Sequence, residues 1–251
     1  FKPNPEDLLV YRDRLKYGLS VLKNMGFENY FLLVHQVVNQ AKDMEIMVGP
    51  GRGSVGGSLV AFLMGITDVD PIRFGLIFER FINPDRVDVP DADLDFMSSR
   101  REDIIEWLIE KYGQDHVCGI SNYGQMGSSS AIRYVGRVHD LPAYDIACSK
   151  QVPKEHGSSK SLQKSVEEVP AIKAFATANP QAWQDAVNLQ GVFNIYGQHA
   201  AGIVVSGRPI VENGVVERRK GGEVCNWDKS VVEDFGLVKL DILGLSNLDV
   251  L

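Results

Sequence analysis

Aspartates stand at every second position of residues 90–96, where Asp91, Asp93 and Asp95 alternate with other residues. A β-strand turns alternate side chains to the same face, so this pattern gathers three negative charges on one patch. Like charges held that close repel one another unless a cation lies between them. Carboxylate oxygens on a stiff strand are ligands that suit Mg²⁺. The segment therefore predicts a magnesium site.

A glycine-rich turn at residues 51–56 forms the second candidate site. Its spacing matches the G-x-G-x-x-G pattern of dinucleotide-binding loops, but Asp70 runs into Pro71 instead of ending a second parallel strand. A phosphate-binding P-loop is not favoured either, because Gly57 stands where that loop needs lysine. Backbone N–H groups and the Ser54 hydroxyl at a helix start still favour anion binding. A turn whose glycines serve only packing is the alternative.

The acidic strand has two other interpretations. Four carboxylates occupy the ligand positions of an EF-hand calcium loop: Asp91, Asp93, Asp95 and Glu102. Phe96 stands where that loop requires glycine, and the preceding proline disfavours the incoming helix, so calcium binding is not favoured. The solvated polar face of a strand is the other interpretation, but it poorly explains three aspartates crowded on one side.

Asp241 is a further acidic candidate, in an apolar run at residues 236–243 that predicts a strand. Buried strands seldom carry a charge without a partner. Lys239 shares a face with Asp241 by the two-residue period, so an ion pair between them is the simple explanation. A role for Asp241 in a site is the other.

The remaining pattern predicts the elements that position these residues. Helices are expected at residues 5–25, 30–43, 59–64, 71–81 and 99–112, and strands at residues 45–48, 89–96, 201–206 and 236–243. A capping box of Ser99 and Glu102 is predicted to begin the last of these helices. The pattern becomes helical between 122 and 196, which indicates an inserted subdomain. The expected fold class is α/β (α+β), divided into residues 1–121, 122–196 and 197–251, with the last part rejoining the first sheet.

The composition is that of a soluble globular protein, with 251 residues, 44% of them hydrophobic and 24% charged. No apolar run approaches the roughly 20 residues that span a bilayer, and no signal peptide is recognisable, so we expect a cytoplasmic protein. The ends read as those of a fragment. The three widely spaced cysteines predict buried thiols. A net charge of −7 leaves nucleic-acid binding open, because a binding face can be basic while the rest is acidic.

Five motifs, in this order, resemble the palm of the bacterial replicative DNA polymerase III alpha subunits, the C family of DNA polymerases. They lie at residues 30–32, 48–54, 78–84, 90–96 and 236–241. The resemblance extends over nearly the whole chain. It implies a polymerase-β-like nucleotidyltransferase palm, with a mostly helical thumb-like insertion at residues 122–196 that grips the primer–template duplex.

The resemblance also implies a catalytic site. Asp93, Asp95 and Asp241 would be the catalytic residues and the ligands of two Mg²⁺ ions, while Gly53 and Ser54 would cradle the incoming triphosphate. The strand pattern alone does not choose between the three aspartates of residues 90–96. The choice comes from the resemblance.

The same comparison suggests phosphate-binding residues. Arg80, Arg86 and Lys239 are candidates to bind the nucleotide, and Arg133 and Arg137 are candidates to face the DNA backbone. A solvated helix face is the alternative for the last two.

The sequence departs from the family at two basic positions. Serines fill residues 128–130, where the family commonly has a lysine, and Gln198 precedes His199 where the family often has lysine before histidine. These losses weaken the expectation for DNA contact rather than for the metal site. His199 is expected to be a structural or backbone-contacting residue rather than a general base.

The activity implied is DNA-templated DNA polymerisation, in which a primer 3′-hydroxyl attacks the α-phosphate of a deoxynucleoside triphosphate (dNTP). The partners would be primer–template DNA and dNTP, with the sliding clamp and other replisome subunits bound through regions outside this chain. Two alternatives remain: a template-independent nucleotidyltransferase of the same fold, and a catalytically inactive DNA-binding fragment. Template dependence and Mg²⁺ dependence distinguish them.

Overall fold

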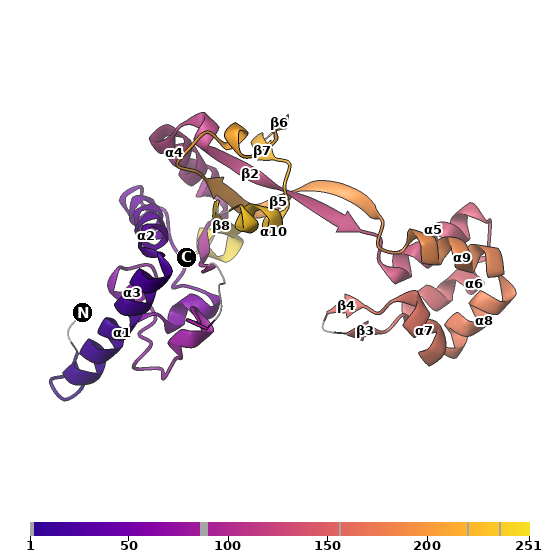
Figure 1. Ribbon diagram of the computed structural model, residues 1–251, viewed down its shortest axis with the longest axis horizontal. Helices are drawn as coiled ribbons and strands as arrows, with labels where there is room; N and C mark the ends of the chain where they lie inside the picture. The colour runs from indigo at the N-terminus through magenta and orange to yellow at the C-terminus, as the bar shows by residue number, and fades with distance from the viewer. Residues whose placement is uncertain (1–2, 86–89, 156, 220, 236) are drawn as a thin grey trace. The chain divides into compact units, whose positions relative to one another are not determined.

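The computed structural model describes residues 3–85, 90–155, 157–219, 221–235 and 237–251. The chain forms two compact units, which we call unit 1 (Phe1–Ser121 with Gln198–Leu251) and unit 2 (Asn122–Gly197). Helices and a mixed sheet make it an α+β protein (Figure 1). No described helix is long and apolar enough to cross a membrane. The names palm and thumb for these units stay predictions.

The described helices of unit 1 precede and follow the strand that carries the aspartates. They are α1 (Leu8–Met25), α2 (Glu28–Asp43), α3 (Leu59–Leu63), α4 (Arg101–Tyr112) and α10 (Lys229–Asp234). Helix α1 ends where Gly26 takes a left-handed conformation with φ +73°, which glycine adopts without strain. Helix α3 begins at Ser58, whose hydroxyl accepts the N–H of Ala61.

The sheet of six strands brings distant parts of the chain together. Its strands are β1 (Asp93–Met97), β2 (Val117–Gln125), β5 (Phe193–Val205), β6 (Val216–Arg219), β7 (Gly222–Cys225) and β8 (Val238–Leu245), in the spatial order β1-β8-β5-β2-β7-β6. Strands β1 and β8 are parallel, and β5 is antiparallel to β8. The last segment of the chain therefore rejoins the first sheet, as predicted.

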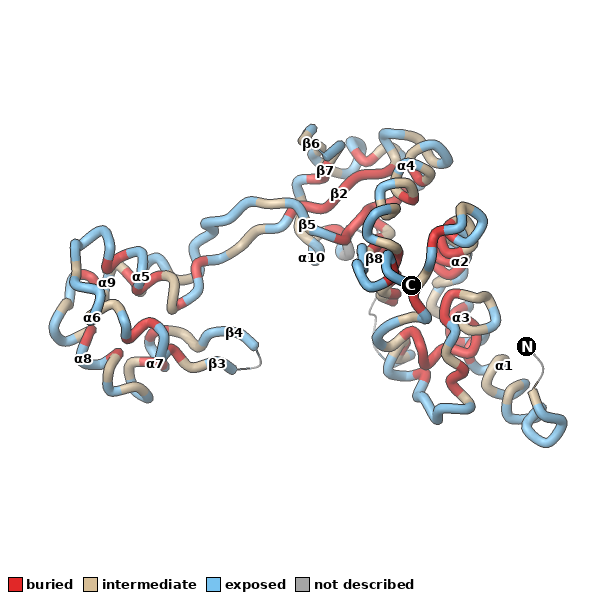
Figure 2. The backbone as a smooth tube through the Cα atoms, turned by 180° about the vertical axis from the view of Figure 1, so that it is seen from behind, coloured by how far each residue is buried: buried red, intermediate tan, exposed pale blue. Residues whose placement is uncertain are grey.

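One face of β1 and β8 packs into the main core. Leu94, Phe96, Leu240 and Ile242 are at most 3% exposed, and they join a cluster that includes the buried faces of α2 and α4. Figure 2 shows the buried stretches of α2 and of the strands. Burying each such side chain contributes about 1.5–3 kcal/mol. Because strand side chains alternate, this core turns the intervening polar residues of β1 and β8 to the opposite face.

Unit 2 has its own core and is mainly helical. Its elements are α5 (Ser128–Val138), α6 (Ala143–Ile146), the two-stranded β3 (Lys154–Glu155) and β4 (Ser158–Ser159), α7 (Leu162–Glu168), α8 (Pro170–Ala178) and α9 (Pro180–Leu189). Prolines begin α8 and α9, where a missing N–H costs nothing. Ile132, Leu162 and Ile172 are fully buried in its hydrophobic cluster.

Three predicted elements differ from the structure. The predicted helix at 71–81 is wrong: the segment is turns with a short 3₁₀ segment at Phe78–Arg80, because Asp70 Oδ1 accepts two backbone N–H groups and Gly75 has φ +61°. The predicted strand at 45–48 makes only one isolated bridge, between Val48 and Phe96.

The predicted capping box is also wrong. Helix α4 begins at Arg101, and the Ser99 hydroxyl instead donates to Asp249 Oδ1 at 2.7 Å. Glu102 pairs with its neighbour Arg101. A tertiary contact with the end of the chain has replaced the local one.

Candidate metal centre

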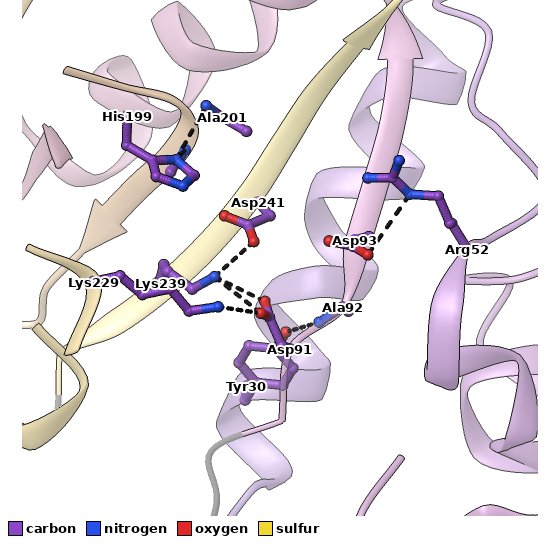
Figure 3. Close-up of polar contacts among 11 residues, drawn as sticks. Tyr30, Arg52, Asp91, Ala92, Asp93, His199, Ala201, Lys229, Lys239 and Asp241 are labelled. Atoms are coloured by element: carbon purple, nitrogen blue, oxygen red, sulfur yellow. Dashed lines mark hydrogen bonds and ion pairs between the residues drawn. The ribbon is translucent and has the colours of Figure 1, made fainter. Parts of the chain in front are cut away.

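Three carboxylates meet beside the polar face of β1 and β8: Asp93 and Asp241 lie on these strands, and Asp91 lies two residues before β1. Asp93 lies opposite Asp241 in the parallel register, although the two residues are 148 positions apart in the sequence. Oxygens of Asp91, Asp93 and Asp241 all lie within 4.8 Å of one another. Figure 3 shows the three side chains pointing toward one another. The set offers hard oxygen ligands of the kind that bind Mg²⁺.

Two lysines neutralise part of this charge. Lys239 Nζ donates to both oxygens of Asp91 at 3.0 and 3.1 Å and to Asp241 Oδ2 at 2.6 Å, while Lys229 Nζ donates to Asp91 Oδ2 at 2.8 Å. Burial alone would raise the pKa of Asp91, but the hydrogen bonds from the two lysines outweigh it and lower this pKa below its usual value. The predicted Lys239–Asp241 ion pair is confirmed.

One carboxylate oxygen of Asp241 lacks a partner in the described part of the chain. Its Oδ1 is buried and has no hydrogen-bond partner among the described residues. A buried carboxylate oxygen left unsatisfied is costly, and an ion is one of the few explanations for it in a folded protein. The donor set and this unsatisfied oxygen fit a divalent cation.

The charge of Asp93 is only weakly compensated by its described neighbours. Burial raises its pKa; Arg52 opposes that effect, and the neighbouring charges of Asp91 and Asp241 add to it. Arg52 Nε lies 3.7 Å from Asp93 Oδ2 and 3.8 Å from Asp95 Oδ2. The guanidinium is half exposed, so it compensates these carboxylates only weakly.

Asp95 lies on the same strand but outside the set of three. Its side chain is about nine-tenths buried, contacts Arg52, and packs under Gly49, where a Cβ would lie 3.0 Å from Asp95 Cβ. The Gly49 N–H donates to the Asp95 carbonyl at 2.8 Å. The structure thus brings Asp91, rather than Asp95, next to Asp93 and Asp241.

The glycine-rich turn docks beside the carboxylates. Arg52 forms an isolated backbone bridge with Asp93, which fixes the turn against β1. Gly57 must lack a side chain, because a Cβ there would lie 2.5 Å from the Ile77 carbonyl oxygen. Gly53 has φ +71°, a conformation that glycine adopts readily.

A cavity of about 220 Å³ opens next to this turn. Its lining residues include Gly53, Ser54 and Arg80. Arg80 is exposed, and no described carboxylate pairs with it. A positive side chain therefore lies beside the backbone of the predicted anion site. Arg86, the other predicted phosphate-binding arginine, lies outside the described residues.

The predicted DNA-contacting arginines belong to unit 2. Arg133 and Arg137 are exposed one turn apart on α5, whose opposite face is buried. Arg133 Nη2 donates to Ser130 Oγ at 3.1 Å. This arrangement is compatible with a phosphate-binding face and with a solvated one.

Two residues that shape the site were missed by sequence reasoning. Tyr30 is 6% exposed, and its hydroxyl accepts the N–H of Ala92 at 2.8 Å, which holds the backbone between Asp91 and Asp93. The motif at residues 30–32 contains Tyr30, but the resemblance implies no role for this residue. Lys229 carries no periodic signal, since its proximity to Asp91 depends on how the chain folds back.

The comparisons with known proteins decide the family. The model of the bacterial DNA polymerase III alpha NTPase domain matches residues 4–244. The chain belongs to this family. DNA polymerase III subunit alpha of Yersinia pestis is 46% identical over 251 residues, which cover 100% of this chain and 21% of that protein. The corresponding subunits of Deinococcus radiodurans and Thermus aquaticus are 43% and 40% identical over 95% of this chain, covering 18% and 20% of those proteins.

Membership of the DNA polymerase III alpha family confirms the resemblance at the level of the family. The chain spans about a fifth of the length of these relatives.

Proposed function

We propose that this chain is the palm, with a thumb-like insertion, of a DNA-directed DNA polymerase that adds dNTPs to a primer 3′-hydroxyl during replication. The observation that carries the proposal is the register of β1 and β8. It sets Asp93 against Asp241, while the glycine-rich turn bridges to β1 at the same residue. Acidic ligands and an anion site therefore lie side by side, which two-metal phosphoryl transfer requires.

The proposed metal ligands are Asp93, Asp95 and Asp241. Asp93 and Asp95 would serve both Mg²⁺ ions, and Asp241 the ion at the primer end. Bound there, the ions would activate the 3′-hydroxyl and stabilise the charge that develops on the triphosphate. The family resemblance leaves Asp91 out of this set. In support, both Lys229 and Lys239 pair with Asp91, whereas the buried Oδ1 of Asp241 has no described partner.

The chain's own residues would bind and orient the nucleotide. Gly53 and Ser54 would hold the triphosphate through backbone N–H groups and a hydroxyl, with Arg80 at the same cavity. Lys239 is 5% exposed and fixed between Asp91 and Asp241, so its ammonium group stays close to the carboxylates. We assign it, with Arg86, to the phosphates of the incoming nucleotide.

Unit 2 would contact the duplex. Arg133 and Arg137 supply two exposed positive charges on α5 for the DNA backbone. The sliding clamp and other replisome subunits would bind elsewhere in the full-length protein.

Extension of a labelled primer by the full-length protein tests this function. We expect Mg²⁺-dependent incorporation directed by the template, and loss of at least a hundredfold in Asp93→Asn. Asp13→Asn, an exposed aspartate on α1, is the matched control and should extend normally. Extension that ignores the template would favour a template-independent transferase. No incorporation by folded wild type would favour a DNA-binding role.

A further inference from the structure

His199 is fixed by the main chain of its own strand. Its Nδ1 accepts the N–H of Gly202 at 2.8 Å and the N–H of Ala201 at 3.3 Å. A ring nitrogen that accepts a hydrogen bond carries no proton, so the neutral ring bears its proton on Nε2. The contacts therefore assign one tautomer, in which Nε2 is a hydrogen-bond donor.

Gly202 places this ring on the metal-centre face. A Cβ at Gly202 would lie 3.0 Å from His199 Nδ1, so the ring covers the position where a side chain would project. Gly202 is the direct partner of Asp241 in the antiparallel pair of β5 and β8. Residues directly opposite in such a pair project to the same face. Figure 3 draws the His199 ring on β5 and Asp241 on the neighbouring β8.

The strand order places the groups on this face in the sequence glycine-rich turn, Asp241 and His199. Arg52 and the glycine-rich turn dock on β1, Asp241 lies on β8, and His199 lies on β5 beyond it. In the proposed function the triphosphate occupies the β1 side and Asp241 serves the primer end. His199 is therefore at the primer end. Within the described part of the chain, no protein acceptor meets its Nε2.

We propose that the Nε2–H of His199 donates a hydrogen bond to the last phosphate of the primer strand, and so positions the 3′ end beside Asp241. This inference rests on the proposed function. His199 does not act as the general base, because Nδ1 is occupied by two N–H donors and Nε2 already carries a proton. It is a primer-binding residue whose donor is aligned before DNA arrives.

Two substitutions separate this role from a structural one. His199→Asn keeps an acceptor near Nδ1 for the backbone N–H groups but has no donor at the position of Nε2. His199→Gln places an amide donor near Nε2 and gives up the backbone contact. A structural role predicts that Asn is tolerated and Gln is not, whereas the primer-binding role predicts the reverse.

The test is the affinity of the full-length protein for a labelled primer–template, measured by fluorescence anisotropy without dNTP. We expect His199→Asn to raise the dissociation constant about 3- to 10-fold, the worth of one hydrogen bond. His199→Gln should stay nearer the wild type, and the KM for dNTP should be unchanged in both. His35→Asn, which alters a histidine on α2 bonded to the Met64 carbonyl, is the control.

A modified primer tests the same contact without relying on how the variants fold. Replacing the last internucleotide phosphate with a neutral methylphosphonate should weaken binding by the wild type more than by His199→Asn. Three results would overturn the inference. The methylphosphonate could weaken binding by the wild type and by His199→Asn equally, or the Asn and Gln variants could bind primer–template with equal affinity. A comparable change in the KM for dNTP would be the third. Failure of the wild type to extend the primer would instead overturn the proposed function. The affinity comparison does not depend on extension, so the two failures are distinguishable.

Discussion

Replacing Asp91 with asparagine removes one negative charge from between two lysines and keeps the size of the side chain. Lys229 loses an ion pair at 2.8 Å, and Lys239 loses contacts at 3.0 and 3.1 Å. The Lys239 side chain is only 4% exposed, so its charge depends on protein partners. Asp241, at 2.6 Å, remains as its carboxylate partner.

The magnitude follows from how far the pair is buried. Breaking a fully buried ion pair costs about 3–5 kcal/mol, and breaking an exposed pair costs about 0–1 kcal/mol. The Asp91 side chain is 36% exposed and Lys239 keeps one partner, so we expect a loss of about 1–2 kcal/mol. For a chain of this size such a loss lowers the Tm by about 2–8 °C.

Thermal unfolding followed by circular dichroism measures this loss of stability. Primer extension over a Mg²⁺ titration measures whether the Mg²⁺ requirement changes. Because we assign Asp91 to holding Lys239 and not to binding metal, Asp91→Asn should need no more than about twice the Mg²⁺ of the wild type. If Asp91→Asn abolished extension as Asp93→Asn is expected to do, or raised the Mg²⁺ requirement tenfold, Asp91 would be a metal ligand and our choice of Asp95 would be wrong.

Three further perturbations test the supports of the site. Tyr30→Phe leaves the backbone N–H between Asp91 and Asp93 without its acceptor, so it should cost about 1–3 kcal/mol in thermal unfolding and slow primer extension; normal values for both would contradict this. Gly57→Ala forces a Cβ against the Ile77 carbonyl and should raise the KM for dNTP while destabilising the chain by about 1–3 kcal/mol; an unchanged KM would count against the anion site. The hydrogen bond to Asp70 raises the pKa of Tyr11 from 10.0 to about 12, so its stabilisation is complete below pH 10 and is lost as pH rises through 12. The alkaline fall in Tm should therefore be shallower over that window in Tyr11→Phe, and equal slopes would refute the assignment.

Much of the fold could be predicted because its signals are local. Helices α1 and α2 and strands β1 and β8 follow from apolar periodicity, with ends that differ by a few residues. The helix expected at 71–81 failed because apolar spacing there competes with a side-chain-stabilised turn after Asp70 and with Gly75. The capping box failed because the Ser99 hydroxyl has a better partner far along the chain.

The candidate site could be predicted only in part, because its geometry depends on non-local pairing. The alternation of the aspartates places three charges on one face, but it does not say which of them meets Asp241. The register of β1 with β8 places Asp93 opposite Asp241, and Asp91 joins these two. No sequence period could reveal that Lys229 reaches Asp91, since the contact depends on α10 packing against β8, the neighbour of β1 in the sheet.

Metal rescue of Asp241→Cys tests the central claim most directly. A thiolate binds Mg²⁺ poorly and softer ions well. The full-length variant should fail to extend a primer in Mg²⁺ and regain template-directed extension when Mn²⁺ or Cd²⁺ is added, under conditions where the wild type extends with Mg²⁺ alone. Normal extension by the variant in Mg²⁺, or no recovery with either softer ion in a folded protein, would contradict the assignment of Asp241 as a metal ligand.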